Sequence, residues 1–338
     1  MPGPEGGRII TFYSSTGGTG RSMALANIAW ILAGNGLRVL AVDWDLESPG
    51  LYRYFHPFLA EQAIGAAQGV VDLLNDYLRA SVAPGPRTAN WHVEYARVLR
   101  HAISLTFDKN KLFPDNGTLD YLSAGQVTSQ DAPAHWEAFY RIDGVHQFIT
   151  ALRADMKRNY DYVLIDSQTG LNDTASICAE VIPDVVAACF VLSDHSIDMT
   201  AQFARLILDA EPARRHIRIL PVPMKIDMIE TRRANAGRAA ARKAFAGFPN
   251  GLSDPQRAAY WETAGIPYMS AAAFEENLAA FEDRTAPPSL LNAYERLTAV
   301  ISEGQVSALP PMDEQTRIRY RDAFTRKSPP EPLREASA

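Results

Sequence analysis

The stretch Ser15-Thr16-Gly17-Gly18-Thr19-Gly20-Arg21-Ser22 decides how the rest of this sequence is interpreted. It lies between an apolar run at 8–14 and a helical pattern that begins near residue 22. Glycine lets a backbone wrap closely around an anion, and the first turn of a helix offers unpaired N–H groups and the positive end of the helix dipole. The stretch therefore predicts a phosphate-binding turn. The alternative is a glycine-rich turn that holds no phosphate.

Apolar runs of strand length alternate with helical patterns along most of the chain. We expect strands at 8–14, 37–43, 119–122, 160–166, 185–192 and 217–222, and a shorter one near 265–268. Helices are expected at 22–35, 70–80, 197–210, 230–245 and 289–302. This alternation predicts a doubly wound α/β fold, in which a mainly parallel sheet carries helices on both faces.

The domain organisation follows from where this alternation is interrupted. We expect one nucleotide-binding domain over 8–305. The irregular or helical segment at about 52–118 is interpreted as an insertion packed over the carboxyl edge of the sheet. Residues 306–338 are polar and rich in proline near their end, which predicts a linker or a disordered tail.

The composition is that of an ordinary globular protein, with 47% hydrophobic and 21% charged residues. The net charge of −6 argues against a surface that generally coats nucleic acid. We expect Cys178 and Cys189 to be buried, reduced thiols, as in the cytoplasm. No signal-peptide pattern and no apolar run of the ~18–20 residues that would span a bilayer is found, so a cytoplasmic protein is predicted.

Three aspartates follow predicted strands. Asp43 and Asp45 come at and after the end of 37–43, and Asp166 ends 160–166, with Gly170 four residues further on. Each aspartate alone could cap a turn or a helix. Because the carboxyl ends of parallel strands share one edge of a sheet, we expect all three beside the phosphate-binding turn. Carboxylates beside an anion cradle predict a Mg²⁺–nucleotide site.

These stretches resemble the MinD/ParA branch of P-loop ATPases, the SIMIBI class with a deviant Walker A motif. That motif reads K-G-G-x-G-K-[ST] and is followed by a D-x-D strand end. The matching stretches are 11–14, 17–30, 43–51 and 160–174, and the similarity extends over 8–300. The chain is most similar to a variant group with arginine in place of the second lysine. The resemblance implies a three-layer α/β/α P-loop NTPase fold that binds ATP and Mg²⁺.

The resemblance also implies roles for individual residues. Asp45 would polarise the attacking water, with Arg21 and Asp43 completing the catalytic set. Ser22, Asp43 and Asp166 would hold the metal ion directly or through water. The backbone N–H of Gly170 would sense the γ-phosphate. Phosphate contacts would come from the segment that comprises Thr16, Gly17, Gly18, Thr19, Gly20, Arg21, Ser22 and Met23.

Base recognition is expected after the strand at 217–222. Met224, Lys225 and Asp227 lie where related ATPases place residues beside adenine. The K-x-D spacing is similar to the guanine-reading N-K-x-D of GTPases, but Met224 replaces the asparagine, which favours ATP over GTP. Tyr268 is expected to form the other wall of the base pocket; an ordinary core or surface aromatic is the alternative.

Two departures from the family pattern concern catalysis. Thr16 stands where the signature lysine would reach across a nucleotide-bound homodimer, and Arg21 replaces the second lysine. Since a charge of this kind is worth ~10³–10⁵ in rate, turnover is expected to be slow or absent. Arginine also contacts phosphate through a planar fork, so it is no neutral substitute for lysine.

The function predicted from these features is an ATP-binding, dimerising switch with slow Mg²⁺-dependent hydrolysis, controlling assembly of a signalling, defence or biosynthetic complex. Two alternatives stay open: a non-hydrolysing, nucleotide-gated scaffold, and a ParA-like DNA- or cargo-positioning protein. The basic helix near 231–243 is expected to be a solvated face rather than a nucleic-acid surface. A helix is a candidate at 312–327, with Ile318, Tyr320 and Phe324, but a membrane anchor there is likewise not favoured.

Overall fold

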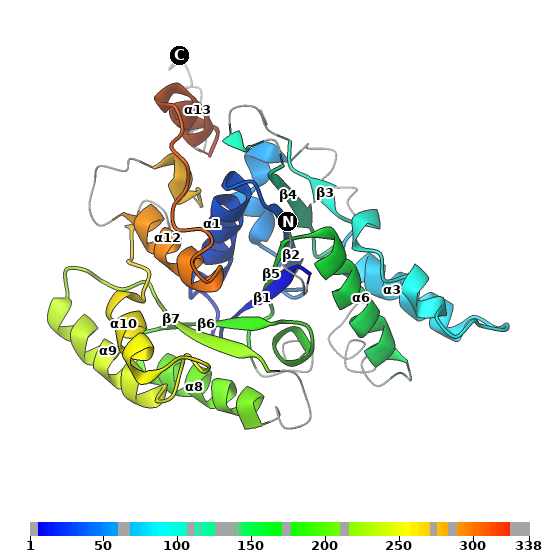
Figure 1. The fold of residues 1–338 in the computed structure, drawn as a ribbon, viewed down its shortest axis with the longest axis horizontal. Coiled ribbons are helices and arrows are strands. Elements are labelled where there is room, and N and C mark those ends of the chain that lie inside the picture. The colour runs from blue at the N-terminus through cyan, green and yellow to red at the C-terminus, as the bar shows by residue number, and fades with distance from the viewer. Residues whose placement is uncertain are drawn as a thin grey trace, which may run out of the picture.

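A seven-stranded sheet forms the centre of the computed structural model, with strand order β3-β4-β2-β5-β1-β6-β7 (Figure 1). All neighbouring strands are parallel except β3 and β4, which are antiparallel. The structure describes residues 6–59, 68–106, 112–114, 116–125, 139, 142, 144–170, 177–209, 216–270, 276–282 and 289–324. The strands are β1 (Arg8–Tyr13), β2 (Arg38–Trp44), β3 (Ile103–Ser104), β4 (Thr118–Leu122), β5 (Tyr162–Ser167), β6 (Val185–Val191) and β7 (Arg218–Met224).

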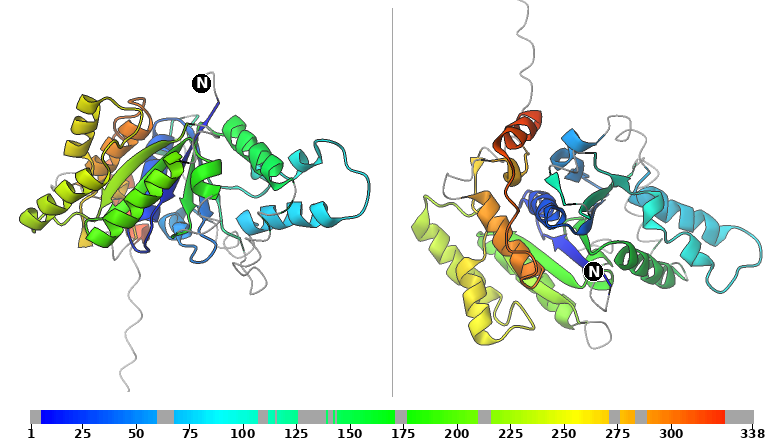
Figure 2. Two further views of the ribbon diagram at one scale, coloured as in Figure 1. Left: turned by 90° about the horizontal axis from the view of Figure 1, so that it is seen from below. Right: turned by 45° about the horizontal axis from the view of Figure 1, so that its top comes forward.

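Helices cover both faces of this sheet, so the predicted doubly wound α/β fold is confirmed (Figure 2). Alternate residues of β1 divide between the two layers, with Ile10 and Phe12 in the core beneath α1 and α12, and Ile9 in the core beneath α6. The helices are α1 (Arg21–Gly34), α3 (Val70–Val82), α6 (Val145–Asn159), α8 (Asp194–Asp209), α9 (Thr231–Ala244), α10 (Asp254–Thr263), α12 (Leu290–Ile301) and α13 (Glu314–Phe324).

The register of the central strands brings the aspartates together. Asp43 of β2 is the direct partner of Asp166 on β5, and Phe12 of β1 also pairs with Asp166. The turn that follows β1 therefore begins beside both carboxylates. The expectation that these residues share one edge of the sheet is confirmed.

Several elements differ from the sequence-based expectations. Helices α6 and α10 and the short strand β3 were not expected, although α6 carries apolar residues at helical spacing: Val145, Phe148, Ile149, Leu152 and Met156. The strand expected near 265–268 is wrong, because this segment makes a single parallel bridge, Ile226 to Pro267. A bridge of one residue pair is too short to give the alternation that identifies a strand.

The segment predicted as an insertion forms part of the helical layer. The N–H groups of Val70 and Val71 donate to the carbonyls of Ser123 and Ala124, just beyond β4, which anchors the start of α3 at the carboxyl edge. Helix α3 then packs beside α6 through Tyr77, whose ring stacks on Phe148 at 4.2 Å between centroids. Figure 2 shows α3 and the loop after it projecting from the side of the sheet.

The prediction of a linker or disordered tail after residue 305 is wrong for residues 306–324. Helix α13 buries Phe324, whose ring lies 5.9 Å from those of Phe58 and Phe281. Leu309 is also buried, and its N–H donates to Glu295 of α12. The aromatic spacing of α13 provides an apolar contact that composition alone did not reveal. The remainder of the predicted tail, 325–338, lies outside the described residues.

Trp30 is the largest side chain buried between α1 and the segments that cover it. Its ring lies 4.9 Å from Phe58, 4.9 Å from Phe113 and 5.2 Å from Phe281. We expect Trp30→Ala to lower the free energy of unfolding by about 3–5 kcal/mol, because it leaves a cavity where these rings meet. Urea titration would measure the change. Leu206→Ala is the control, since Leu206 is 50% exposed and should cost less than ~0.5 kcal/mol.

Candidate nucleotide site

The turn from Ser14 to Gly20 has the shape of an anion cradle. Gly18 and Gly20 adopt φ of 72° and 93°, in the left-handed region that favours glycine. Gly20 is the N-cap of α1, and among the described residues no side chain caps this helix end. The N–H groups of the first turn and the positive end of the helix dipole therefore face the cavity above the turn. This cavity measures about 490 Å³, a size typical of small-ligand sites.

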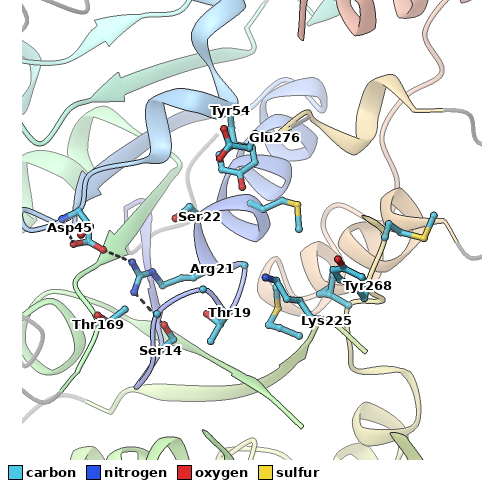
Figure 3. Close-up of a pocket in the computed structure, with 18 of the residues that line it drawn as sticks. Ser14, Thr19, Arg21, Ser22, Asp45, Tyr54, Thr169, Lys225, Tyr268 and Glu276 are labelled. Carbon is cyan, nitrogen blue, oxygen red and sulfur yellow. Dashed lines mark hydrogen bonds and ion pairs between the residues drawn. The ribbon is translucent and has the colours of Figure 1, made fainter. Parts of the chain in front are cut away.

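Arg21 points inward, toward the carboxylates (Figure 3). Its Nε donates to Asp166 at 2.5 Å, one terminal nitrogen donates to Asp45 at 2.8 Å, and the other donates to the Ser14 hydroxyl at 3.3 Å. All three charged residues are buried. Burial favours loss of the Arg21 proton, but the Asp166 and Asp45 carboxylates outweigh it and raise the pKa of Arg21. The guanidinium thus offsets part of the negative charge of Asp45 and Asp166 in this structure.

Ser22 and Asp166 lie together behind the cradle. Ser22 lines the cavity, and its side chain lowers the pKa of Asp166. Burial raises the pKa of Asp166, against the opposing effects of Arg21 and Ser22. No cluster of three or more His, Cys, Asp or Glu side chains poised to hold a metal ion occurs in the described part of the chain. The donors present fit a Mg²⁺ ion whose other ligands are phosphate oxygens and water.

Asp43 is engaged by the backbone of the loop after β2. Its carboxylate accepts hydrogen bonds from the N–H groups of Asp45, Gly50 and Leu51 at 3.3, 3.1 and 3.1 Å. Burial and the neighbouring Asp166 carboxylate raise the pKa of Asp43. Asp43 does not line the cavity, so the structure shows it holding the loop that positions Asp45. Its metal-binding and catalytic roles stay predictions.

The structure places two predicted phosphate contacts away from the cavity lining. The N–H of Gly170 donates to the Ser14 carbonyl at 3.4 Å, while the Gly170 carbonyl accepts from the Tyr13 hydroxyl. Thr169, the preceding residue, does line the cavity. Thr16 does not, and its carbonyl accepts a hydrogen bond from the Ser14 hydroxyl. The Gly170 N–H would have to leave Ser14 before it could contact a phosphate.

The predicted base-side residues divide into two groups. Met224, Lys225 and Tyr268 line the cavity together with Ile266, Pro267 and Met269. Asp227 lies outside it, where its carboxylate accepts from the N–H groups of Ile229 and Glu230 at the start of α9. Asp227 therefore holds the turn that precedes α9, whose N-cap residue Glu230 makes no side-chain capping bond.

Tyr54 and Glu276 also line the cavity but were not predicted from the sequence. They lie together at its edge, opposite Lys225 and Tyr268 (Figure 3). Glu276 pairs with Arg53 at 3.0 Å, although 223 positions separate these two residues in the sequence. Tyr54 ends a four-residue 3-10 helix and Glu276 lies in an irregular segment, and neither stretch is long enough to carry a periodic signal. No local pattern could therefore have identified them.

Solved structures of nucleotide-binding ATPases share this fold. The septum site-determining protein MinD from Pyrococcus horikoshii, complexed with Mg-ADP, has a TM-score of 0.51 and 18% identity over 88% of this chain and 98% of its own. A McdA–ATP complex from Cyanothece has a TM-score of 0.59 and 13% identity over 88% and 96%.

A putative plasmid partition protein from Borrelia burgdorferi, bound to AMPPNP, has a TM-score of 0.57 and 15% identity over 88% of this chain and 99% of its own. No protein-family model matches the chain, and no curated protein matches it. At these identities the likeness shows the three-layer P-loop fold. In the described part of the chain, no helix is both long and apolar enough to cross a membrane.

Proposed function

We propose that this chain, which has the fold of MinD- and McdA-type structures, binds ATP with Mg²⁺ and acts as a nucleotide-dependent switch. The observation that carries the proposal is the convergence of Arg21, Ser22 and Asp45 on one cavity at the start of α1. The bound Mg-ADP, ATP and AMPPNP named for the solved structures support the same class of ligand. As the sequence analysis predicts, the ion would be held by Ser22, with Asp166 and Asp43 supporting it.

Hydrolysis would use residues that already meet in the structure. The N–H groups at the start of α1 hold the phosphates through backbone hydrogen bonds and the helix dipole. Asp45, at the rim of the cavity, orients the attacking water by accepting its proton. When bound, Mg²⁺ supplies charge neutralisation at the β- and γ-phosphate oxygens.

Arg21 links phosphate binding to whether Asp45 and Asp166 are paired or free to act. In this structure its guanidinium occupies Asp45 and Asp166. Incoming phosphate competes with these carboxylates for the same fork of N–H donors, since arginine binds both groups through two parallel hydrogen bonds. Movement of Arg21 to the phosphates would leave Asp45 able to accept a water proton. While Arg21 pairs with Asp45, this carboxylate is not available to accept a water proton.

In this proposal the switch acts by forming a homodimer when nucleotide is bound. Thr16 offers no charge to a partner's phosphates, so the dimer would hydrolyse ATP slowly and persist while ATP is bound. Such a dimer suits control over the assembly of a signalling, defence or biosynthetic complex. The non-hydrolysing scaffold is the second candidate, favoured by the ion pair that holds Arg21 on Asp45.

Calorimetry and light scattering with ATP and Mg²⁺ test the binding and dimerisation steps. Gly17 is a suitable position for a substitution in the cradle, because a Cβ added there meets no heavy atom within 4 Å. We expect Gly17→Asp to bind ATP at least about 10-fold more weakly than Gly17→Asn, since a carboxylate repels phosphate. The asparagine variant controls for size.

The switch would be contradicted if wild type dimerises equally with and without ATP and Gly17→Asp dimerises to the same extent. A wild-type protein that binds no nucleotide would remove its basis.

A further inference from the structure

The charges around the cavity leave one cation available for phosphate. Among the described residues that line the cavity, the basic side chains are Arg21 and Lys225. In this structure Arg21 pairs with Asp45 and Asp166, and it would have to leave both carboxylates before it could bind phosphate. Glu276, an acidic lining residue, is paired with Arg53. In the part of the chain that the structure describes, Lys225 has no carboxylate within ion-pair distance.

Lys225 approaches the phosphate turn rather than only the base side. Its Cε lies 3.6 Å from the position that a Cβ on Gly20 would occupy, which puts the end of the side chain beside the N-terminus of α1. Figure 3 shows Lys225 and Tyr268 beside one another across the cavity from Asp45. The ammonium group and the first turn of α1 therefore face the same space.

The backbone at Lys225 is held firmly in an uncommon conformation. Its φ is 52°, in the left-handed region that few non-glycine residues adopt. The next residue, Ile226, donates to the Ile266 carbonyl and accepts from the Tyr268 N–H, both at 2.9 Å. Asp227 then accepts hydrogen bonds from two N–H groups of the turn that leads into α9. A left-handed residue fixed on its C-terminal side is typical of a functional position.

We propose that Lys225 contacts the terminal phosphates of the bound nucleotide and supplies the lysine charge that the P-loop has lost. A compact ammonium serves phosphate as a point charge, and Lys225 can do so without first breaking an ion pair, unlike Arg21. Lys225 comes from the end of β7, so the charge is delivered within the same chain and not from a dimer partner. This assignment rests on the proposed nucleotide-binding function and specifies which side chain reads the phosphates.

The test is calorimetric titration of ATP, ADP, AMP and adenosine into wild type, Lys225→Asn, Lys225→Arg and Lys243→Asn. Asparagine tolerates the left-handed backbone conformation, so the fold should be retained, and circular dichroism and melting temperature check this. Lys243, exposed in the last turn of α9, is the matched control. We expect Lys225→Asn to weaken ATP and ADP binding by about 10- to 100-fold, as for loss of a charge-assisted hydrogen bond.

Four outcomes separate the hypotheses. AMP and adenosine binding should change less than about 2-fold, and Lys225→Arg should recover part of the loss for ATP and ADP. If ATP binding by Lys225→Asn equals that of Lys243→Asn, the assignment is overturned while the proposed function stands. An equal loss for adenosine would place Lys225 at the base instead and also overturn it. No nucleotide binding by wild type would overturn the proposed function itself.

Discussion

Arg21→Ala is expected to destabilise the protein by about 3–5 kcal/mol, the usual cost of removing one partner from a buried ion pair. Arg21, Asp45 and Asp166 are 6%, 7% and 1% exposed, so water cannot replace the lost guanidinium. Chemical denaturation would measure the change. Arg21→Lys is the matched control, since it keeps the charge but not the fork, and an intermediate loss is expected.

The loss from Arg21→Ala should depend on pH. Burial already raises the pKa of Asp166 while Arg21 opposes the rise, so removal of Arg21 raises this pKa further. A carboxyl whose pKa is higher in the folded state binds more protons when folded, and stability then falls as pH rises above the unfolded pKa. The deficit relative to wild type should therefore grow between about pH 5 and pH 8.

Magnesium provides a second readout of the same variant. Without Arg21 the acidic pair lacks its cation, so Mg²⁺ alone should raise the melting temperature of Arg21→Ala more than that of wild type. A wild-type-like stability of Arg21→Ala at both ends of the pH range would show that the guanidinium does not neutralise this cluster. Equal responses of the two proteins to Mg²⁺ would argue against a cation site at Asp166.

Asp45→Asn is expected to lower the rate of ATP hydrolysis by at least about 100-fold, the lower range for loss of a general base. Asparagine keeps the shape of the side chain, and its carbonyl oxygen can still accept the Ser48 N–H that now contacts Asp45. Binding of ATP should therefore survive while turnover falls. Phosphate release under single-turnover conditions measures the rate, and calorimetry measures the affinity.

The control for Asp45→Asn is Asp198→Asn, an equal change of charge at an exposed position of α8. Its turnover should match that of wild type. If wild type and Asp45→Asn are equally inert with ATP and Mg²⁺, the chain is not an ATPase and the scaffold alternative holds. If Asp45→Asn loses ATP binding in proportion to turnover, Asp45 acts in binding and not on the water.

Much of the fold could be predicted because its signals are local. Strands β1, β2, β5, β6 and β7 are buried apolar runs, and each was predicted to within about two residues, the usual uncertainty of an element boundary. Helix α6 carried an equally clear pattern that was not recognised. Strand β3 is two residues long and paired with β4 at the sheet edge, so no periodicity could reveal it.

The site was predictable only in part, because only some of its features have local signals in the sequence. Glycine spacing identified the cradle, and the strand-end positions of Asp43 and Asp166 implied their meeting, which the register of β2 and β5 confirms. The sequence could not show that Asp43 would be occupied by backbone N–H groups. Nor could the sequence show that Tyr54 and Glu276 line the same cavity, because their proximity depends on how the segments that carry them pack.

The sequence by itself determined the glycine-rich turn before α1 and the parallel sheet, since conformational freedom at glycine and burial of apolar runs are properties of short stretches. Only the tertiary structure decided where the charges point. Arg21 turns to Asp45 and Asp166 because burial makes unpaired charges costly, while Lys225, directly after β7, faces the cradle. Pairing of charges is settled by packing across the whole domain, which no local pattern encodes.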